Sequence, residues 1–68
     1  MGAAKSLRMA MIDKEVSVVK LAAMTGKAKQ TVYNALAADN FKYDNLSMYA
    51  EALDCDVVLR DRKTGKTY

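Results

Sequence analysis

The side chains that most often carry out chemistry in proteins are nearly missing from this sequence. Histidine is absent, and Cys55 is the single cysteine. No disulfide can therefore form within the chain, and the Cys and His spacings that are typical of zinc sites do not occur. Few pairs of nucleophile and base remain, and 68 residues leave little volume for a substrate pocket. We therefore expect no enzyme activity, no catalytic residue, no metal site, no cofactor and no small-molecule ligand.

The length and composition predict one small domain, residues 1–68, because 51% of the residues are hydrophobic and 28% are charged. No apolar run approaches the roughly 18 residues that cross a bilayer, so we expect a soluble, unexported, cytoplasmic chain without a membrane partner. The charge is uneven. Residues 1–42 hold seven Lys and Arg against three acids, a net +4, whereas residues 43–68 hold four against five, a net −1. The basic part suggests a polyanionic partner, although on charge alone a solvated lysine-rich surface is the more common explanation.

Helix signals begin near Ser6 and continue to residue 54. Ser6 is positioned to cap a first helix that runs to Lys14. Ser17 precedes a second apolar run, and Gly26 follows that run where a left-handed residue would end a helix. The second helix is therefore predicted at about residues 18–25.

Two more helices are predicted before residue 54. The third covers Ala28 to Ala37, with one narrow apolar stripe at i, i+4 and i+8. Asp44 is positioned to cap the fourth. The apolar positions expected to face the core of these two helices are Ala28, Val32, Leu36, Leu46, Tyr49, Ala50 and Leu53. Further core positions are expected at Met9, Met11, Met24 and Met48.

A short β-hairpin is predicted at about residues 56–68. Val57, Val58 and Leu59 form a β-favouring run, and Thr64-Gly65 has the composition of a tight turn. A lone hairpin is marginal in water, so this one must be covered. It either packs on its own helices or pairs along its edge with a second copy of the chain, and we favour the homodimer, with these three residues at the interface.

The most informative motif is Leu21-Ala22-Ala23-Met24-Thr25-Gly26, with Val32 six residues after the glycine. Ala22 is small enough for two helices to cross closely, and Gly26 lets the backbone reverse in three or four residues. Val32 can then anchor the next helix against Leu21. This spacing predicts a helix-turn-helix.

With these residues the sequence resembles the lambda-repressor-like, Cro/XRE-type family of phage and bacterial DNA-binding domains, from Leu7 to about Leu53. The segment from Leu46 to Cys55 is similar to the family's "L-x-x-I-A-x-A-L-G" helix, with Tyr49 in place of an aliphatic residue and Asp54 in place of glycine. The resemblance implies a mainly α, lambda-repressor-like helix-turn-helix domain of four helices, here with the predicted C-terminal β-hairpin. It also implies a small, nucleoid-associated transcriptional repressor that occupies a pseudopalindromic operator in double-stranded DNA.

Carried over by position, the resemblance makes residues 28–37 the recognition helix that enters the major groove. Amide side chains can pair with adenine, lysine with guanine, and a threonine methyl with thymine, whereas tyrosine suits phosphate or sugar. The candidate contacts there are Lys27, Lys29, Gln30, Thr31, Tyr33 and Asn34. A phosphate clamp is expected at the start of the fourth helix, at Lys42, Tyr43 and Asn45.

Other interpretations of the same residues stay open. The third helix is otherwise merely an exposed surface helix, and Lys42 an idle surface charge. The same fold can also serve as a protein-interaction module, such as an antitoxin or a phage-encoded inhibitor, or as an architectural or excision factor that bends DNA.

Overall fold

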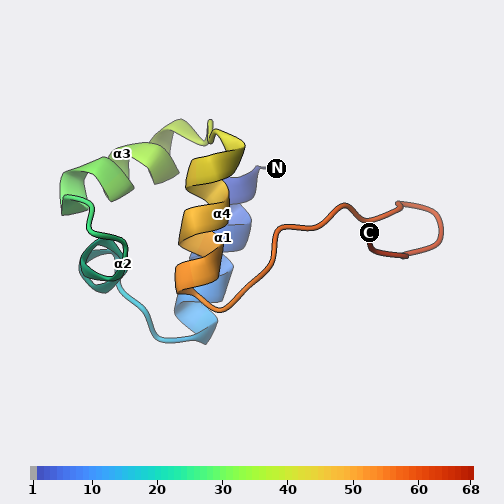
Figure 1. Cartoon of the computed structure of the whole chain (residues 1–68), viewed down its shortest axis with the longest axis horizontal. Helices are drawn as coiled ribbons and strands as arrows, with labels where there is room; N and C mark the ends of the chain where they lie inside the picture. The colour runs from blue at the N-terminus through green and yellow to red at the C-terminus, as the bar shows by residue number, and fades with distance from the viewer. Residues whose placement is uncertain (1) are drawn as a thin grey trace.

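The computed structural model describes residues 2–68, and four helices make up its body. They are α1 (Ala3–Asp13), α2 (Val18–Thr25), α3 (Lys29–Ala38) and α4 (Tyr43–Ala52). Figure 1 shows α1 and α4 running in the same direction, with α3 across one end and α2 beside them, and α1 contacts both α3 and α4. No helix in this part of the chain is long and apolar enough to cross a membrane.

One apolar core joins all four helices. Leu21 and Val32 are the largest side chains that are fully buried, at 0% and 1% exposure. Tyr49, which stands where the family has an aliphatic residue, is also buried, and its ring meets Phe41 edge-on at 6.0 Å between centroids. The other buried core residues are Ala4, Leu7, Met11, Ala22, Leu36, Ala50 and Leu53. Of the predicted core positions, Leu46 is half-buried and Ala28 is exposed.

The local signals around α2 are confirmed. The Ser17 hydroxyl accepts the backbone N–H of Lys20 at 3.1 Å and so caps the helix. Gly26 ends it in the left-handed conformation, with φ of 71°. The observed bounds, Val18–Thr25, match the prediction.

The prediction that Ser6 caps α1 is wrong, because the N-cap residue is Gly2, four residues earlier, and α1 begins at Ala3. The cap comes from another helix end: Asp39, which follows α3 in the left-handed conformation (φ 50°), accepts the Ala4 N–H with Oδ1 at 2.9 Å. A Cβ atom at Gly2 would collide with the Asp39 carboxylate. This cap therefore requires glycine at position 2 and ties the end of α3 to the start of α1.

Helix α4 differs from expectation at its beginning. Lys42, not Asp44, is its N-cap residue, and Asp44 lies in the first turn. After α4, Asp54 adopts the left-handed conformation with φ of 57°, at the position where the family has glycine. The chain thus leaves α4 through the left-handed backbone conformation that glycine favours, although the residue here is an aspartate.

Two of the four methionines expected in the core are exposed, Met9 at 61% and Met24 at 49%. Helix α1 buries Ala4, Leu7 and Met11, and Met9 lies about 200° around the helix from Leu7, at about 100° per residue. Met24 lies in the last turn of α2 and lines a shallow hollow with Met48. Met11 is buried and Met48 is half-buried.

The prediction of a C-terminal β-hairpin is wrong, because residues 2–68 contain no strand. One isolated antiparallel bridge joins Arg60 and Thr67. Its register places Tyr68 opposite Leu59, so within residues 2–68 neither Val57 nor Val58 has a cross-strand partner. Figure 1 shows this segment, which we call the arm (residues 56–68), leaving the helices and ending in a loop.

The turn in the arm is also wider than the two residues predicted. The Asp61 carboxylate accepts the backbone N–H groups of Lys63 at 2.8 Å and Thr64 at 3.1 Å. The Gly65 N–H donates to the Asp61 carbonyl at 2.9 Å. These bonds stabilise a loop of four residues, 62–65, in place of a tight turn centred on Thr64-Gly65. The N–H groups of Thr64 and Lys63 also hold the pKa of Asp61 below its ordinary value of 3.8.

Replacing Asp54 and Asp39 separately by glycine is expected to have different effects on stability. Both substitutions relieve a left-handed backbone, but only Asp39→Gly removes the cap on Ala4. Asp54→Gly should raise the free energy of unfolding by about 0.5–1 kcal/mol. The free energy of unfolding of Asp39→Gly should be lower than that of Asp54→Gly by about 1 kcal/mol, the usual contribution of a cap. Urea unfolding of both variants measures the difference, and equal values would contradict the role of the Asp39 cap.

Acidification is expected to open the loop of the arm before it unfolds the helices. Because the pKa of Asp61 is lowered on folding, its contribution to loop stability is complete above the ordinary value of 3.8 and is lost as the pH falls through the folded value. In an NMR titration the amide signals of Lys63 and Thr64 should shift with a midpoint below 3.8. A midpoint at or above that value would mean that the carboxylate does not hold these N–H groups.

Candidate nucleic-acid interface

A three-residue turn joins α2 to α3. The backbone N–H groups of Gly26 and Lys27 both donate to the Ala22 carbonyl, which closes the end of α2. The Thr25 hydroxyl donates to the Leu21 carbonyl at 2.9 Å. Ala28 is then extended and acts as the N-cap residue of α3. The chain therefore reverses within Gly26–Ala28, as a helix-turn-helix requires.

Burial of three side chains sets the angle between α2 and α3. Leu21 and Ala22 face inward from α2, and Val32 meets them from α3. Ala22 is 4% exposed, so a larger side chain there has no room without moving the helices. The roles predicted for these residues from their spacing match their burial.

The opposite side of α3 is polar and exposed. Lys29, Thr31 and Tyr33 are exposed there, with Lys27 in the turn before them. The Gln30 side chain donates Nε2–H to Oδ1 of Asn34 at 3.0 Å, one helical turn further on. The bond leaves the Gln30 carbonyl, its second N–H and the Asn34 amino group available, which are the donors and acceptors that a base edge pairs with.

The face of α3 with this amide pair borders a broad open hollow of about 970 Å³ between α1, the start of α2 and α3. Gln30, Tyr33 and Asn34 line its side on α3. Arg8 of α1 and Ser17, the cap of α2, line it from the other elements. A cation and a helix N-terminus therefore line the same hollow as the amide pair. Arg8 could not be predicted from its neighbours in the chain, because only the packing of α1 against α3 brings it there.

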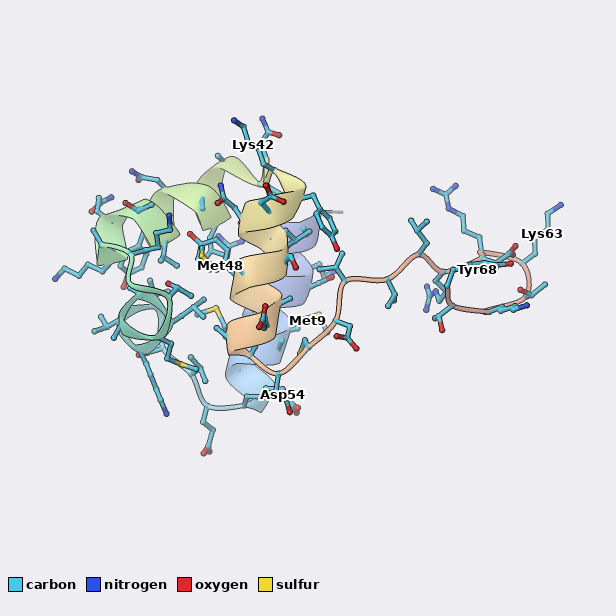
Figure 2. The ribbon with its side chains drawn as sticks, viewed as in Figure 1. Met9, Lys42, Met48, Asp54, Lys63 and Tyr68 are labelled. Carbon is cyan, nitrogen blue, oxygen red and sulfur yellow. The ribbon has the colours of Figure 1, made fainter. Side chains whose placement is uncertain are left out.

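A second group of candidate residues lies at the start of α4. Figure 2 shows Lys42 at this end of the helix, opposite to Asp54. Lys42, Tyr43 and Asn45 are all exposed, and no side chain caps the first backbone N–H groups of α4. These groups favour an anion. Asp44 in the same turn already supplies one negative charge, which weakens the attraction of this helix N-terminus for a phosphate.

The candidate residues thus form two separate regions. The first lies on the helices: the exposed face of α3 with the start of α2 beside it, and the start of α4. The second is the arm, where the exposed fraction rises from 38% at Val57 through 53% at Val58 to 77% at Leu59. Val57 and Val58 line a small hollow with Leu7 of α1 and other residues of α1 and α4, but neither valine is buried in it.

Comparison with known families identifies the fold. A family model described as the Cro/C1-type HTH DNA-binding domain matches residues 6–58, which include nearly all of the four helices. The chain belongs to this family. No curated protein and no solved structure matched the chain. Membership of the Cro/C1-type family makes this a DNA-binding domain and α3 its second helix-turn-helix element. Residues 59–68, with the loop of the arm, lie outside the match.

The metal-ligating side chains and the cysteine of this Cro/C1-type domain lie as follows. In residues 2–68 no group of three or more His, Cys, Asp or Glu side chains is placed to hold a metal ion. The Cys55 thiol is half-buried and donates to the Leu53 carbonyl at 3.4 Å. The arrangement provides hydrogen-bonding and cationic groups on a helical surface, which suit recognition.

Proposed function

We propose that this protein is a sequence-specific DNA-binding repressor that acts by occupying an operator in double-stranded DNA. The observation that carries the proposal is the Gln30–Asn34 hydrogen bond on the exposed face of α3, directly after the turn. An uncharged amide pair flanked by Lys27 and Lys29 combines base-reading groups with cations that attract phosphate.

The Gln30–Asn34 pair is suited to reading sequence because both side chains are already ordered before DNA binds. Each long side chain that a complex immobilises costs about 0.5–1.5 kcal/mol of entropy, and the bond from Gln30 to Asn34 already restricts both. The pair favours adenine through its N6 and N7 atoms, and Lys29 favours guanine. Thr31 adds a methyl group for thymine, while Tyr33 contacts phosphate or sugar.

Contacts to the DNA backbone fix the position of α3 in the groove. Lys42, Tyr43 and Asn45 at the start of α4 supply a cation and hydrogen-bond donors for phosphates. Such contacts set the register and carry no sequence information of their own. The protein needs no cofactor for this activity, and it works in the cytoplasm on the nucleoid, where its DNA lies.

We further propose that the active form is a homodimer joined through the arm. The bonds from Asp61 N–H to the Lys66 carbonyl and from Tyr68 N–H to the Leu59 carbonyl use one edge of residues 59–61. The backbone groups of Val58 and Arg60 therefore face the other, open edge. Antiparallel pairing of Val57–Leu59 with a second copy would supply the missing strand and cover these apolar side chains.

A two-fold dimer places two copies of α3 about 34 Å apart, which is one turn of the duplex. Its operator is therefore a pseudopalindrome. Dimerisation also suits the size of the domain, because a core of fewer than 70 residues without disulfide or metal rarely supplies more than about 3–5 kcal/mol.

Selection from a randomised duplex pool tests sequence reading. We expect enrichment of a pseudopalindrome with half-sites about one helical turn apart. On the recovered site Gln30→Ala should cost about 1–3 kcal/mol and relax the preference at one base pair. Lys42→Ala should weaken binding to all duplexes alike and lower the dependence on salt. The measurement is equilibrium binding across several salt concentrations.

Lys14→Ala is the control for that measurement, since Lys14 is exposed at the far end of α1. It should change binding less than Lys42→Ala does. Equal losses for Gln30→Ala and Lys42→Ala on every sequence would refute the assigned roles. Retention without enrichment, accompanied by bending of the bound fragment, would indicate an architectural factor. No retention at low salt would indicate a protein-interaction module.

Sedimentation equilibrium at micromolar concentration tests the dimer. We expect about twice the chain mass for the wild type and the monomer mass for Val58→Asp, because a charge at the paired edge opposes association. Val19→Asp on α2 is the matched control, since Val19 and Val58 are 56% and 53% exposed. It should remain dimeric. A wild-type monomer even when bound to duplex would exclude this interface.

A further inference from the structure

The end of the arm is the most basic part of the chain. Residues 60–68 contain Arg60, Arg62, Lys63 and Lys66 against the single acid Asp61, a net +3 that equals the formal charge of all 68 residues. Each of the four cations is exposed, and none forms an ion pair with another residue in 2–68. The positive charge of this loop is therefore not neutralised within the described chain.

The loop is built so that its acid faces inward. Asp61 Oδ1 accepts two backbone N–H groups, from Lys63 and Thr64. The Lys66 N–H donates to the Thr64 hydroxyl at 3.2 Å, and the Asp61 N–H donates to the Lys66 carbonyl at 2.8 Å. Figure 2 shows the Lys63 side chain projecting away from the loop. The carboxylate holds the loop together. The Lys66 ammonium lies over the Tyr68 ring at 5.4 Å from its centroid, and Arg60, Arg62 and Lys63 remain available to a ligand.

The position of the loop separates it from the reading helix. Figure 1 shows the arm leaving the helices on the side opposite to α2. The molecule measures 38 Å along its longest axis, slightly more than one turn of B-form DNA at about 34 Å. With α3 in a major groove, a loop at the end of this axis is far enough from α3 to reach phosphates outside the base pairs that α3 reads.

We infer that the loop of residues 60–68 is a second, sequence-independent contact to DNA phosphates that flank the segment read by α3. The inference rests on the proposed function, because the polyanion is the same duplex. The partner follows from charge complementarity: several exposed cations without an ion pair, on an ordered loop, match the closely spaced charges of a DNA backbone. The contact adds affinity and salt dependence but no base preference.

Single charge removals test the contact. Lys63→Gln and Lys14→Gln each remove one exposed cation, from the loop and from the far end of α1. For Lys63→Gln we expect the slope of log K against log salt to decrease by about 0.9, and affinity at 0.15 M salt to fall about 5-fold. Lys14→Gln should change both values much less. Equal changes for the two variants would show a general field effect and overturn the inference.

Two substitutions at Asp61 separate local order from net charge. Asp61→Asn and Asp61→Ala give the same net charge, but only asparagine keeps a side-chain oxygen for the N–H groups of Lys63 and Thr64. We expect Asp61→Asn to bind duplex at least as tightly as the wild type and Asp61→Ala several-fold more weakly. Amide exchange at Thr64 reports whether the loop is ordered in each variant. Equal affinity of the two variants, with exchange at Thr64 faster only in Asp61→Ala, would show that binding does not depend on the ordered loop and would overturn the inference.

The outcomes distinguish this inference from the proposed function. If the wild type binds no duplex, the proposed function fails and the inference fails with it. If the wild type binds its selected site and Gln30→Ala weakens it while Lys63→Gln leaves the salt slope unchanged, only the inference fails. Loss of binding by Lys63→Gln to vesicles that contain phosphatidylserine, with DNA binding unaffected, would assign the loop to a membrane surface and also overturn the inference.

Discussion

Burial of Leu21 against Val32 is the contact on which the rest of this structure depends. Both side chains are almost entirely removed from water, and each contributes about 1.5–3 kcal/mol by its burial. More important, one lies before the turn and the other after it, so their contact fixes the direction in which α3 leaves Gly26. The polar side of α3 faces outward because Val32 and Leu36 take the inner side.

The elements that could be predicted from the sequence are those set by neighbours in the chain. Ser17 and Gly26 are the observed ends of α2, because a cap and a left-handed residue act within one helical turn. The candidate contacts on α3 are exposed, as a helix with one apolar stripe requires. Their roles in binding DNA stay predictions.

The errors have a common physical cause, since each depends on distant parts of the chain. The true cap of α1 is Asp39, which sequence spacing cannot connect to Ala4. The β propensity of Val57–Leu59 does not make a strand, because a strand also needs a hydrogen-bonding partner. Met9 has an apolar side chain but lies on the side of α1 away from the core, and neighbouring Leu7 and Met11 take the buried positions.

The contact between Gly2 and Asp39 also has a meaning for sequence variation. Any side chain at position 2 would occupy the space of the Asp39 carboxylate, and a residue at position 39 without a side-chain oxygen in this place would leave the start of α1 without this cap. Neither position can drift freely while the other is kept. Among relatives in which the end of α3 caps the start of α1, positions 2 and 39 should change together. Their covariation across a sequence alignment would then reflect this one hydrogen bond between two different helices.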